Sequence, residues 1–369
     1  MDRRNFLKYT LGTSVLTSIN VFAKTNSKNN PNLLFVLLRG GADGLSMLVP
    51  YSDSNYYEQR PRIAIPKEKC ISINNTFGLN PSLSNYVNWY KNNQAVFIPA
   101  AGQINNSRSH FQAQDVLEFG VNNITTYKSG FLGRMQEVLG SNKSISFTEN
   151  MSPILTSEKL TIPNVSANQL RGVFNFNTKI VDYSGELNNI YSNVEKNIQI
   201  IEDIKGDNGK LSNVGKFMKE GNYNIGFVDF NDWDTHSEQG ALDGRLNFLL
   251  ANLNKELKEF EIAVGDEYWK NTIVVVMSEF GRKFKQNGNG SDHGHGNLMT
   301  ILGGMISKSN IVGDWLDLKE KNLHQNRDLP VFYEYRDILG ELFIKMYGLN
   351  NSEINYIFPN VNPTKFNLI

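Results

Sequence analysis

The hydrophobic positions of the chain fall into short continuous runs that alternate with longer amphipathic stretches. Apolar runs of this kind are too short for ordinary helices and are typical of strands in a parallel sheet that is covered on both faces. The alternation of strands and helices predicts an α/β fold with an open sheet. The predicted strands are Leu33–Leu38, Ala95–Pro99, Ile225–Phe230, Thr272–Met277 and Leu298–Leu302.

Helices are predicted between these runs. Pro81 suits the first position of a helix over Ser82–Lys91, because the N–H that proline lacks would have no partner there. Apolar residues spaced three and four apart predict a long amphipathic helix that packs on the sheet. Another helix is expected over Tyr335–Tyr347. The apolar stripe consists of Leu242, Leu246, Leu249, Leu250, Leu253, Leu257 and Phe260.

The first 23 residues have the order of regions that signal peptides show. Arg3 and Arg4 open a basic stretch, and Tyr9–Ala23 is a weakly apolar run that ends in small residues. This run is shorter than the roughly 20 residues that a helix needs to cross a bilayer, so no stable transmembrane segment is expected. The Arg-Arg-x-Phe-Leu-Lys string resembles the twin-arginine export motif. It predicts cleavage and export by that machinery to the periplasm or cell surface, with an uncleaved anchor or a chance basic start as the alternative.

The amino-acid composition indicates how the remainder of the chain is divided into segments. Residues 24–32 are a polar linker, and residues 33–369 are interpreted as one domain in which 140–220, rich in Asn, Ser and Lys, is a peripheral insertion. Basic and acidic residues number 37 each, and removal of residues 1–23 leaves 34 against 36. Nucleic acid is therefore not an expected partner, because it requires a positive surface. Cys70 is the single cysteine, which excludes an intrachain disulfide and a thiolate metal cluster.

Four of the five histidines lie in short polar motifs. Imidazole nitrogens and carboxylate oxygens together suit zinc, manganese or iron. Asp292, His293 and His295 lie within four residues of one another and are the strongest local indication of a metal site, although a polar surface loop would look the same. Asp234 and His236 follow a predicted strand, and their alternative place is the N-terminus of the next helix.

Two more acidic residues follow predicted strands, at the sheet edge where sites of open α/β folds gather. Asp43 lies in a Gly-rich turn and is either a metal ligand or an ordinary turn residue. Glu279 needs a metal or a charged partner because burial of a carboxylate is costly, and Arg282 is the alternative partner. The Gly-rich segment 40–44 lacks the spacing of nucleotide-binding loops, so nucleotide binding is not expected.

Ser109 opens a predicted helix that runs through Glu118. Its hydroxyl is either a helix cap or a nucleophile activated by a metal or by the neighbouring His110. The start of a helix also favours a bound anion. The chain has no G-x-S-x-G sequence, so a Ser-His-Asp esterase is not expected. Arg108 and Arg282 are candidates for orienting an anionic substrate.

Five motifs together resemble, in the same order, those of the bacterial family catalogued as domain of unknown function 1501. They span nearly the whole chain after the predicted signal. That family is placed with the alkaline-phosphatase and sulfatase superfamily, so the resemblance implies a three-layer α/β/α sandwich with a mainly parallel sheet, alkaline-phosphatase-like, and metal-bound acids. The motifs are Leu38–Leu45, Arg108–Phe111, Trp233–His236, Ser278–Arg282 and Asp292–Gly294.

The resemblance also assigns roles to residues. It makes Ser109 the counterpart of the superfamily's nucleophile. Relatives usually carry Asp-His or Asp-Asn where Glu279 and Phe280 stand here, so a single ion or an inactive site are alternatives to a two-metal site. The residues that resemble metal ligands are Asp43, Asp234, His236, Glu279 and either His293 or His295, with Asp292 beside them.

The expected function is metal-dependent hydrolysis of a phosphate or sulfate ester. The cofactor would be a divalent ion (zinc, manganese or calcium), and the substrate a small or polymeric anionic ester. The alternative is a non-catalytic exported protein of the same fold that binds a glycan, a lipid or a protein partner.

Overall fold

The computed structural model describes residues 31–123, 127–140, 144–166 and 209–369. The predicted signal over residues 1–23 and nearly all of the linker lie outside the described residues. So does the larger part of the predicted insertion, over residues 167–208. None of the described helices is long and apolar enough to cross a membrane.

Eight strands of the described residues form the central sheet, with seven in the order β10-β5-β9-β8-β1-β7-β6 and β11 paired to β5. β9 is antiparallel to both of its neighbours, and the other pairs are parallel. The predicted α/β fold with a mainly parallel sheet is thus confirmed. The strands are β1 (Asn32–Leu38), β5 (Ala95–Gly102), β6 (Ser144–Phe147), β7 (Ile225–Phe230), β8 (Thr272–Met277), β9 (Asn297–Leu302), β10 (Asn310–Ile311) and β11 (Tyr333–Glu334).

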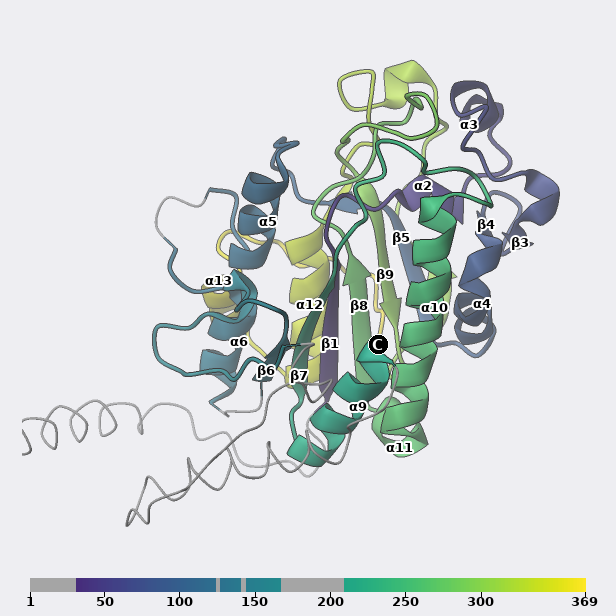
Figure 1. Cartoon of the computed structure of the whole chain (residues 1–369). Helices are drawn as coiled ribbons and strands as arrows, with labels where there is room; N and C mark the ends of the chain where they lie inside the picture. The colour runs from purple at the N-terminus through teal and green to yellow at the C-terminus, as the bar shows by residue number, and fades with distance from the viewer. Residues whose placement is uncertain (1–30, 124–126, 141–143, 167–208) are drawn as a thin grey trace, which may run out of the picture.

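Helices cover both faces of this sheet, which gives three layers (Figure 1). α4, α9 and α10 lie on one face, and α5, α6, α12 and α13 on the other. The described helices are α2 (Gly44–Met47), α3 (Ser54–Gln59), α4 (Ser84–Lys91), α5 (His110–Phe119), α6 (Phe131–Leu139), α9 (Lys210–Gly221), α10 (Arg245–Val264), α11 (Asp266–Trp269), α12 (Tyr335–Tyr347) and α13 (Asn351–Ile357). Short 3-10 turns lie at Lys67–Lys69, Pro81–Leu83, Pro153–Leu155 and Glu320–Asn322, and a small sheet joins β2 (Leu48–Val49), β3 (Ile71–Ser72) and β4 (Gly78–Leu79).

The central strand β1 shows why its apolar run is continuous. All of its residues are buried, and successive side chains point to opposite faces of the sheet. Leu33, Phe35 and Leu37 belong to the core beneath α5, α6 and α12, and the alternate residues belong to the core beneath α9 and α10. Because both faces need apolar side chains, the strand has no polar alternation.

Some boundaries differ from those expected. β5 continues past Pro99, because strand pairing with β9 shifts register between Ile98 and Ala101 and thereby accommodates a residue without an N–H. The leucine-striped helix α10 begins only at Arg245, since residues up to Gly244 form a loop. Pro81 opens a 3-10 turn that leads into α4.

The described parts of the predicted insertion are not peripheral. Ser144–Phe147 is the edge strand β6, which pairs with β7 along its whole length. Lys210–Gly221 forms α9, whose apolar residues Leu211, Val214 and Phe217 are fully buried in the same core as α10. Weak periodicity concealed these elements because a short buried strand presents few residues from which a period can be read.

The chemistry-bearing motifs meet at one end of the sheet, the upper end in Figure 1. The parallel strands β1, β5, β7 and β8 all end there, so the loops that follow them are neighbours. β9 runs the other way, so the segment that precedes it, rather than the one that follows, reaches the same edge. This is how residues 292–296 join loops that follow the other strands.

A buried ion pair stabilises this end of the domain. Asp43 and Arg60 lie 2.6 Å apart, between Oδ2 and Nη1, and their side chains are 1% and 0% exposed. Ser46 and Gln239 also donate to the same carboxylate, each at 2.7 Å. Burial would raise the pKa of Asp43, but the charge of Arg60 and these hydrogen bonds outweigh it and lower that pKa. Asp43 therefore serves as the anionic partner of Arg60.

We expect Asp43→Ala to lower the free energy of unfolding by about 3–5 kcal/mol, because Arg60 would stay buried without a counter-charge. The loss should be complete above the ordinary aspartate pKa of about 3.9 and should shrink as the pH falls below it, because the native pKa is the lower one. Urea unfolding followed by tryptophan fluorescence at several pH values measures it. Asp317→Ala, which removes an exposed partner of Lys319, is the control and should change little. Equal stability of both variants would contradict the assignment.

Candidate metal centre

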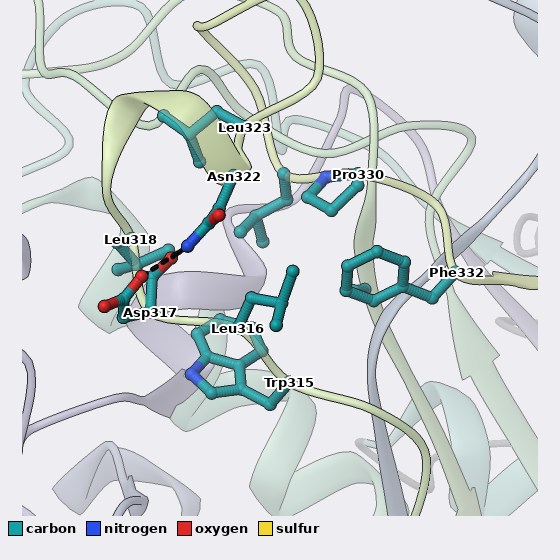
Figure 2. A pocket seen from close by; sticks show the side chains of 10 residues that line it. Trp315, Leu316, Asp317, Leu318, Asn322, Leu323, Pro330 and Phe332 are labelled. Atoms are coloured by element: carbon teal, nitrogen blue, oxygen red, sulfur yellow. Dashed lines mark hydrogen bonds between the residues drawn. The ribbon is translucent and has the colours of Figure 1, made fainter.

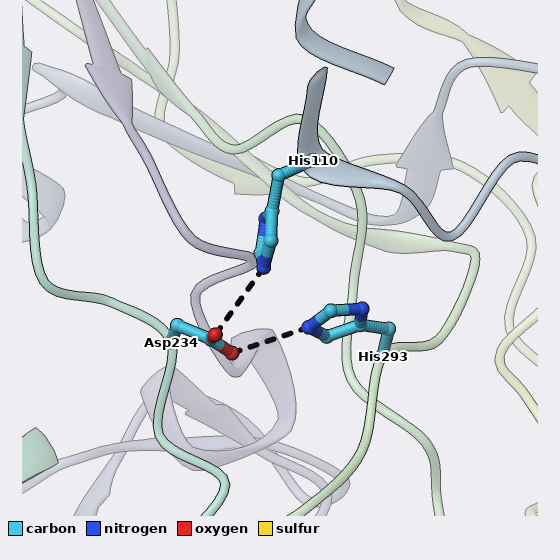
Figure 3. Close-up of side chains that lie close together, drawn as sticks. All are labelled: His110, Asp234 and His293. Carbon is cyan, nitrogen blue, oxygen red and sulfur yellow. Dashed lines mark hydrogen bonds and ion pairs between the residues drawn. The ribbon is translucent and has the colours of Figure 1, made fainter. Parts of the chain in front are cut away.

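Three side chains from separate segments point at one another at the sheet edge (Figure 3). His110 is the first residue of α5, Asp234 follows β7, and His293 precedes β9. Each offers one ligand atom, and these atoms all lie within 4.8 Å of one another. Asp234 is central, with its Oδ2 at 3.3 Å from His110 Nε2 and its Oδ1 at 3.2 Å from His293 Nε2.

His236 extends this group to four residues, which we call the histidine cluster: His110, Asp234, His236 and His293. The Nε2 atom of His236 lies 3.2 Å from Asp234 Oδ1 and 2.9 Å from His293 Nε2. Three imidazole nitrogens therefore lie within 3.3 Å of the Asp234 carboxylate, and those of His110 and His293 also lie within 4.8 Å of each other. Such nitrogen and oxygen donors suit zinc, which in catalytic sites takes three protein ligands and keeps its fourth position open.

The hydrogen bonds of the Nδ1 atoms, which point away from the cluster, determine which ring nitrogens carry a proton. His110 Nδ1 lies 2.8 Å from Glu279 Oε1, and His293 Nδ1 lies 2.7 Å from the carbonyl oxygen of Arg108. Both partners only accept hydrogen bonds, so each Nδ1 carries its proton and, in the neutral ring, each Nε2 keeps its lone pair. His110 Nε2 is buried and makes no hydrogen bond to any described residue. The lone pairs and the carboxylate face each other, an arrangement that a bound cation stabilises.

Glu279 holds His110 from behind rather than joining the inner group. Its carboxylate also accepts hydrogen bonds from the backbone amides of Gly40 and Gly41 and from Gln114. Burial alone would raise the pKa of Glu279, but the hydrogen bonds from His110 and Gln114 outweigh it and lower that pKa. The hydrogen bond with Glu279 in turn raises the pKa of His110. Such a carboxylate–histidine pair fixes the ring orientation of a metal ligand.

Arg282 ties the loops of the site together. Its guanidinium donates to the carbonyl oxygens of Gly40, Gly41, Trp233 and Ser291 and to Asp234 Oδ1 at 2.6 Å. Burial would raise the pKa of Asp234, but Arg282 lowers it to about 2, so this carboxylate stays ionised. The Arg282 side chain is itself fully buried, which leaves it out of reach of a substrate.

Asp43, Asp292 and His295 lie outside the histidine cluster. Asp43 forms the buried ion pair with Arg60. Asp292 Oδ1 lies 3.5 Å from the outer nitrogen, Nδ1, of His236. His295 is turned away, with its ring centroid 4.3 Å from that of His324. Two histidines two residues apart in a loop thus face different surroundings.

Ser109 and Arg108 stand beside the cluster. Ser109 is the exposed N-cap of α5, and its hydroxyl makes no capping hydrogen bond. Arg108 is bound through its guanidinium to Asp328 at 2.6 Å and to Gln325 at 2.8 Å, so only part of its donor capacity is available.

Two supporting residues were not predicted from the sequence. Gln114 bonds Glu279, and its spacing of four residues from His110 on a predicted helix could have indicated it. Phe280 is buried, and its ring packs on those of His110 and His293 with centroids 5.0 and 4.9 Å apart. It supplies an apolar wall beside both rings.

The pocket drawn in Figure 2 lies apart from this cluster, between the 3-10 turn at Glu320–Asn322 and the segment around Trp315. Its walls are mainly apolar. The enclosed space of about 10 Å³ has room for a single water molecule. It is therefore too small to be a substrate site.

We expect the purified protein to bind Zn²⁺ and His110→Ala or His293→Ala to weaken that binding at least about a hundredfold, since each removes a converging nitrogen. Isothermal calorimetry with zinc measures the affinities. His324→Ala is the control, because His324 lies outside the cluster and should leave the affinity at the parent's value. Identical affinities in all three variants would remove the cluster from consideration as a metal centre.

Comparison with solved structures finds remote similarities. One is a protein in the alkaline phosphatase superfamily from Vibrio parahaemolyticus (TM-score 0.43, 11% identity, 94% of this chain and 75% of that chain). Another is the C-terminal periplasmic domain of the phosphoethanolamine transferase EptC from Campylobacter jejuni (TM-score 0.41, 9% identity, 91% and 96%). A third is the lipoteichoic acid synthase LtaP from Listeria monocytogenes (TM-score 0.36, 10% identity, 84% and 73%).

No curated protein matches the chain. The model of one protein family does match, over residues 216–357. This stretch includes Asp234, His236, Glu279 and His293, three of which belong to the histidine cluster. Over residues 216–357 the chain is similar to the family described as protein of unknown function (DUF1501).

Proposed function

We propose that this protein is an exported, metal-dependent hydrolase of phosphate or sulfate esters. The observation that carries the proposal is the convergence of three imidazole Nε2 atoms on the ionised carboxylate of Asp234, with acceptors behind the rings. The histidine cluster would hold a divalent ion. Such an ion, when bound, polarises an ester oxygen and lowers the pKa of a nearby hydroxyl or water.

The protein's own groups prepare the site for an anion. The backbone N–H groups in the first turn of α5 have no helical partners, and the helix dipole favours negative charge at this end. Ser109 is the N-cap residue, directly before the cluster residue His110, and its hydroxyl makes no capping hydrogen bond. An ester group bound there would lie against both the cluster and the hydroxyl.

Ser109 is the proposed nucleophile. Its hydroxyl oxygen would bond to the phosphorus or sulfur atom and lose its proton to solvent, while the ester bond to the alcohol breaks and the leaving alkoxide takes a proton from solvent. Water would later attack the same atom, release the phosphate or sulfate and return a proton to the Ser109 oxygen. Glu279 would keep the proton of His110 on Nδ1 throughout, which keeps Nε2 directed at Asp234. Arg282 would keep Asp234 ionised and in place. Phe280 would exclude water from one side of the two rings.

We expect Ser109→Ala to lower kcat on an aryl phosphate or aryl sulfate by at least about a thousandfold while zinc content and melting temperature stay near the parent's, because only the attacking oxygen is lost. Steady-state kinetics on zinc-loaded protein measures this. If water were the nucleophile the loss would be modest, and if Ser109 only capped the helix the variant would lose about 1 kcal/mol of stability with little loss of activity. Either result would refute the nucleophile, whereas zinc binding without turnover of any ester in the parent would favour a binding protein.

The export part of the proposal rests on the N-terminal motif, which lies outside the described residues. We expect mature protein from the native cell to begin near Lys24, as mass spectrometry would show. Replacement of Arg3 and Arg4 together by lysine should stop export, because the twin-arginine machinery requires the arginine pair. An intact N-terminus on most molecules would contradict cleavage, and unchanged export of the variant would contradict the route.

A further inference from the structure

A cavity of about 340 Å³ lies beside the histidine cluster, along α5. It is bounded by α5, by the loop that follows β6 and by the ends of β1 and β7. Its volume is within the range of small-molecule sites, unlike the pocket of Figure 2. The residues that form its walls are Arg39, Phe111, Gln114, Asp115, Glu118, Glu149, Asn150, Met151, Ser152, Pro153, Asp229 and Asn231.

The cavity is connected to the cluster by a direct chain of hydrogen bonds. Arg39 Nη1 donates to Gln114 Oε1 at 2.8 Å, and Gln114 Nε2 donates to Glu279 Oε1 at 2.9 Å. The same oxygen of Glu279 accepts the hydrogen bond from His110 Nδ1. Gln114 therefore forms part of the cavity wall and of the support for the cluster, so a ligand in the cavity lies next to the candidate metal centre.

The walls of the cavity carry an excess of negative charge. Among the described lining residues, Arg39 alone is basic, and it is bound to two carboxylates, Glu118 at 2.6 Å and Asp229 at 2.7 Å. Lys210, which does not line the cavity, also lies 3.9 Å from Asp229 Oδ1. A further acidic residue, Asp115, also lines the space. The side-chain carboxylate of Asp115, which lies within α5, makes no hydrogen bond or ion pair with any described residue. An anionic group is therefore disfavoured in the cavity, and a cationic group is favoured.

Apolar surface stands beside these carboxylates. Phe111, the residue after His110, is 85% exposed, and Met151 across the cavity is 40% exposed. An exposed aromatic ring next to an unpaired carboxylate suits an alkylammonium group, which gains both from the ring face and from the negative charge. The ring face carries partial negative charge and therefore does not attract a small anion.

We propose that this cavity binds the alcohol part of the ester and selects substrates whose alcohol carries an alkylammonium group. This inference rests on the proposed hydrolase function, which places the phosphate or sulfate at the histidine cluster and Ser109. The alkylammonium group of the alcohol then extends along α5, past Phe111 towards Asp115. The anionic end of such a substrate would then lie at the histidine cluster, and its ammonium group would lie at the carboxylate of Asp115, further along α5.

Choline and its neutral isostere 3,3-dimethylbutan-1-ol test the cavity, because they differ in charge but hardly in shape. Binding to the metal-free mature protein is measured by calorimetry or ligand-observed NMR. We expect choline to bind at least about tenfold more tightly than the alcohol, and Asp115→Asn and Phe111→Ala each to remove most of that preference. Asp232→Asn is the matched control, since Asp232 is an exposed carboxylate outside the cavity walls.

Equal affinities for choline and the alcohol, an absence of saturable binding, or an Asp115→Asn variant that binds choline as the parent does would each overturn the proposal. A melting temperature near the parent's shows that the variants are folded. Because binding is measured without metal or turnover, it separates the two proposals: hydrolysis of an aryl phosphate without choline binding refutes the cavity alone, and choline binding without turnover of any ester refutes the hydrolase alone.

Discussion

The buried carboxylate of Glu279 is the group on which the geometry of the site depends. It accepts hydrogen bonds from the backbone amides of Gly40 and Gly41 and from the side chains of His110 and Gln114, and it thereby connects the ends of β1 and β8 with the first turns of α5. An ionised carboxylate inside a protein is costly unless such donors surround it. The contacts that compensate its burial are the same ones that orient the imidazole of His110.

Arg282 completes this arrangement with the opposite charge. While Glu279 takes the N–H groups of Gly40 and Gly41, Arg282 donates to their carbonyl oxygens and to Asp234. The turn at these glycines has φ values of +121° and +68°, and a Cβ on Gly40 would lie 2.5 Å from the backbone nitrogen of Asp234. Glycine is therefore required for the loops after β1 and β7 to approach each other closely. A pair of buried charges of opposite sign holds this turn from both sides.

Helix α5 separates two electrostatic environments. Its N-terminus, with Ser109 and His110, faces a cluster in which three imidazole nitrogens lie close to the ionised carboxylate of Asp234. Its next turns, with Phe111 and Asp115, line a cavity whose acidic side chains outnumber its single guanidinium. A cation bound by the histidine cluster would place positive charge close to the acidic side chains of the cavity. A ligand with charge of both signs fits such a surface in one orientation.

The sequence by itself determined the α/β class, the five long strands of the sheet and the identity of the polar motifs, because strand and helix periods are local properties. It could not assign the individual acids and bases. Asp43 and Arg282 follow strands just as Asp234 does, yet they are buried against Arg60 and against backbone carbonyls, whereas Asp234 faces the histidines. Likewise, His293 and His295 stand two residues apart and face different partners. Only the tertiary structure decided these roles, since the direction of β9 and the packing of α5 determine which side chains share one point in space.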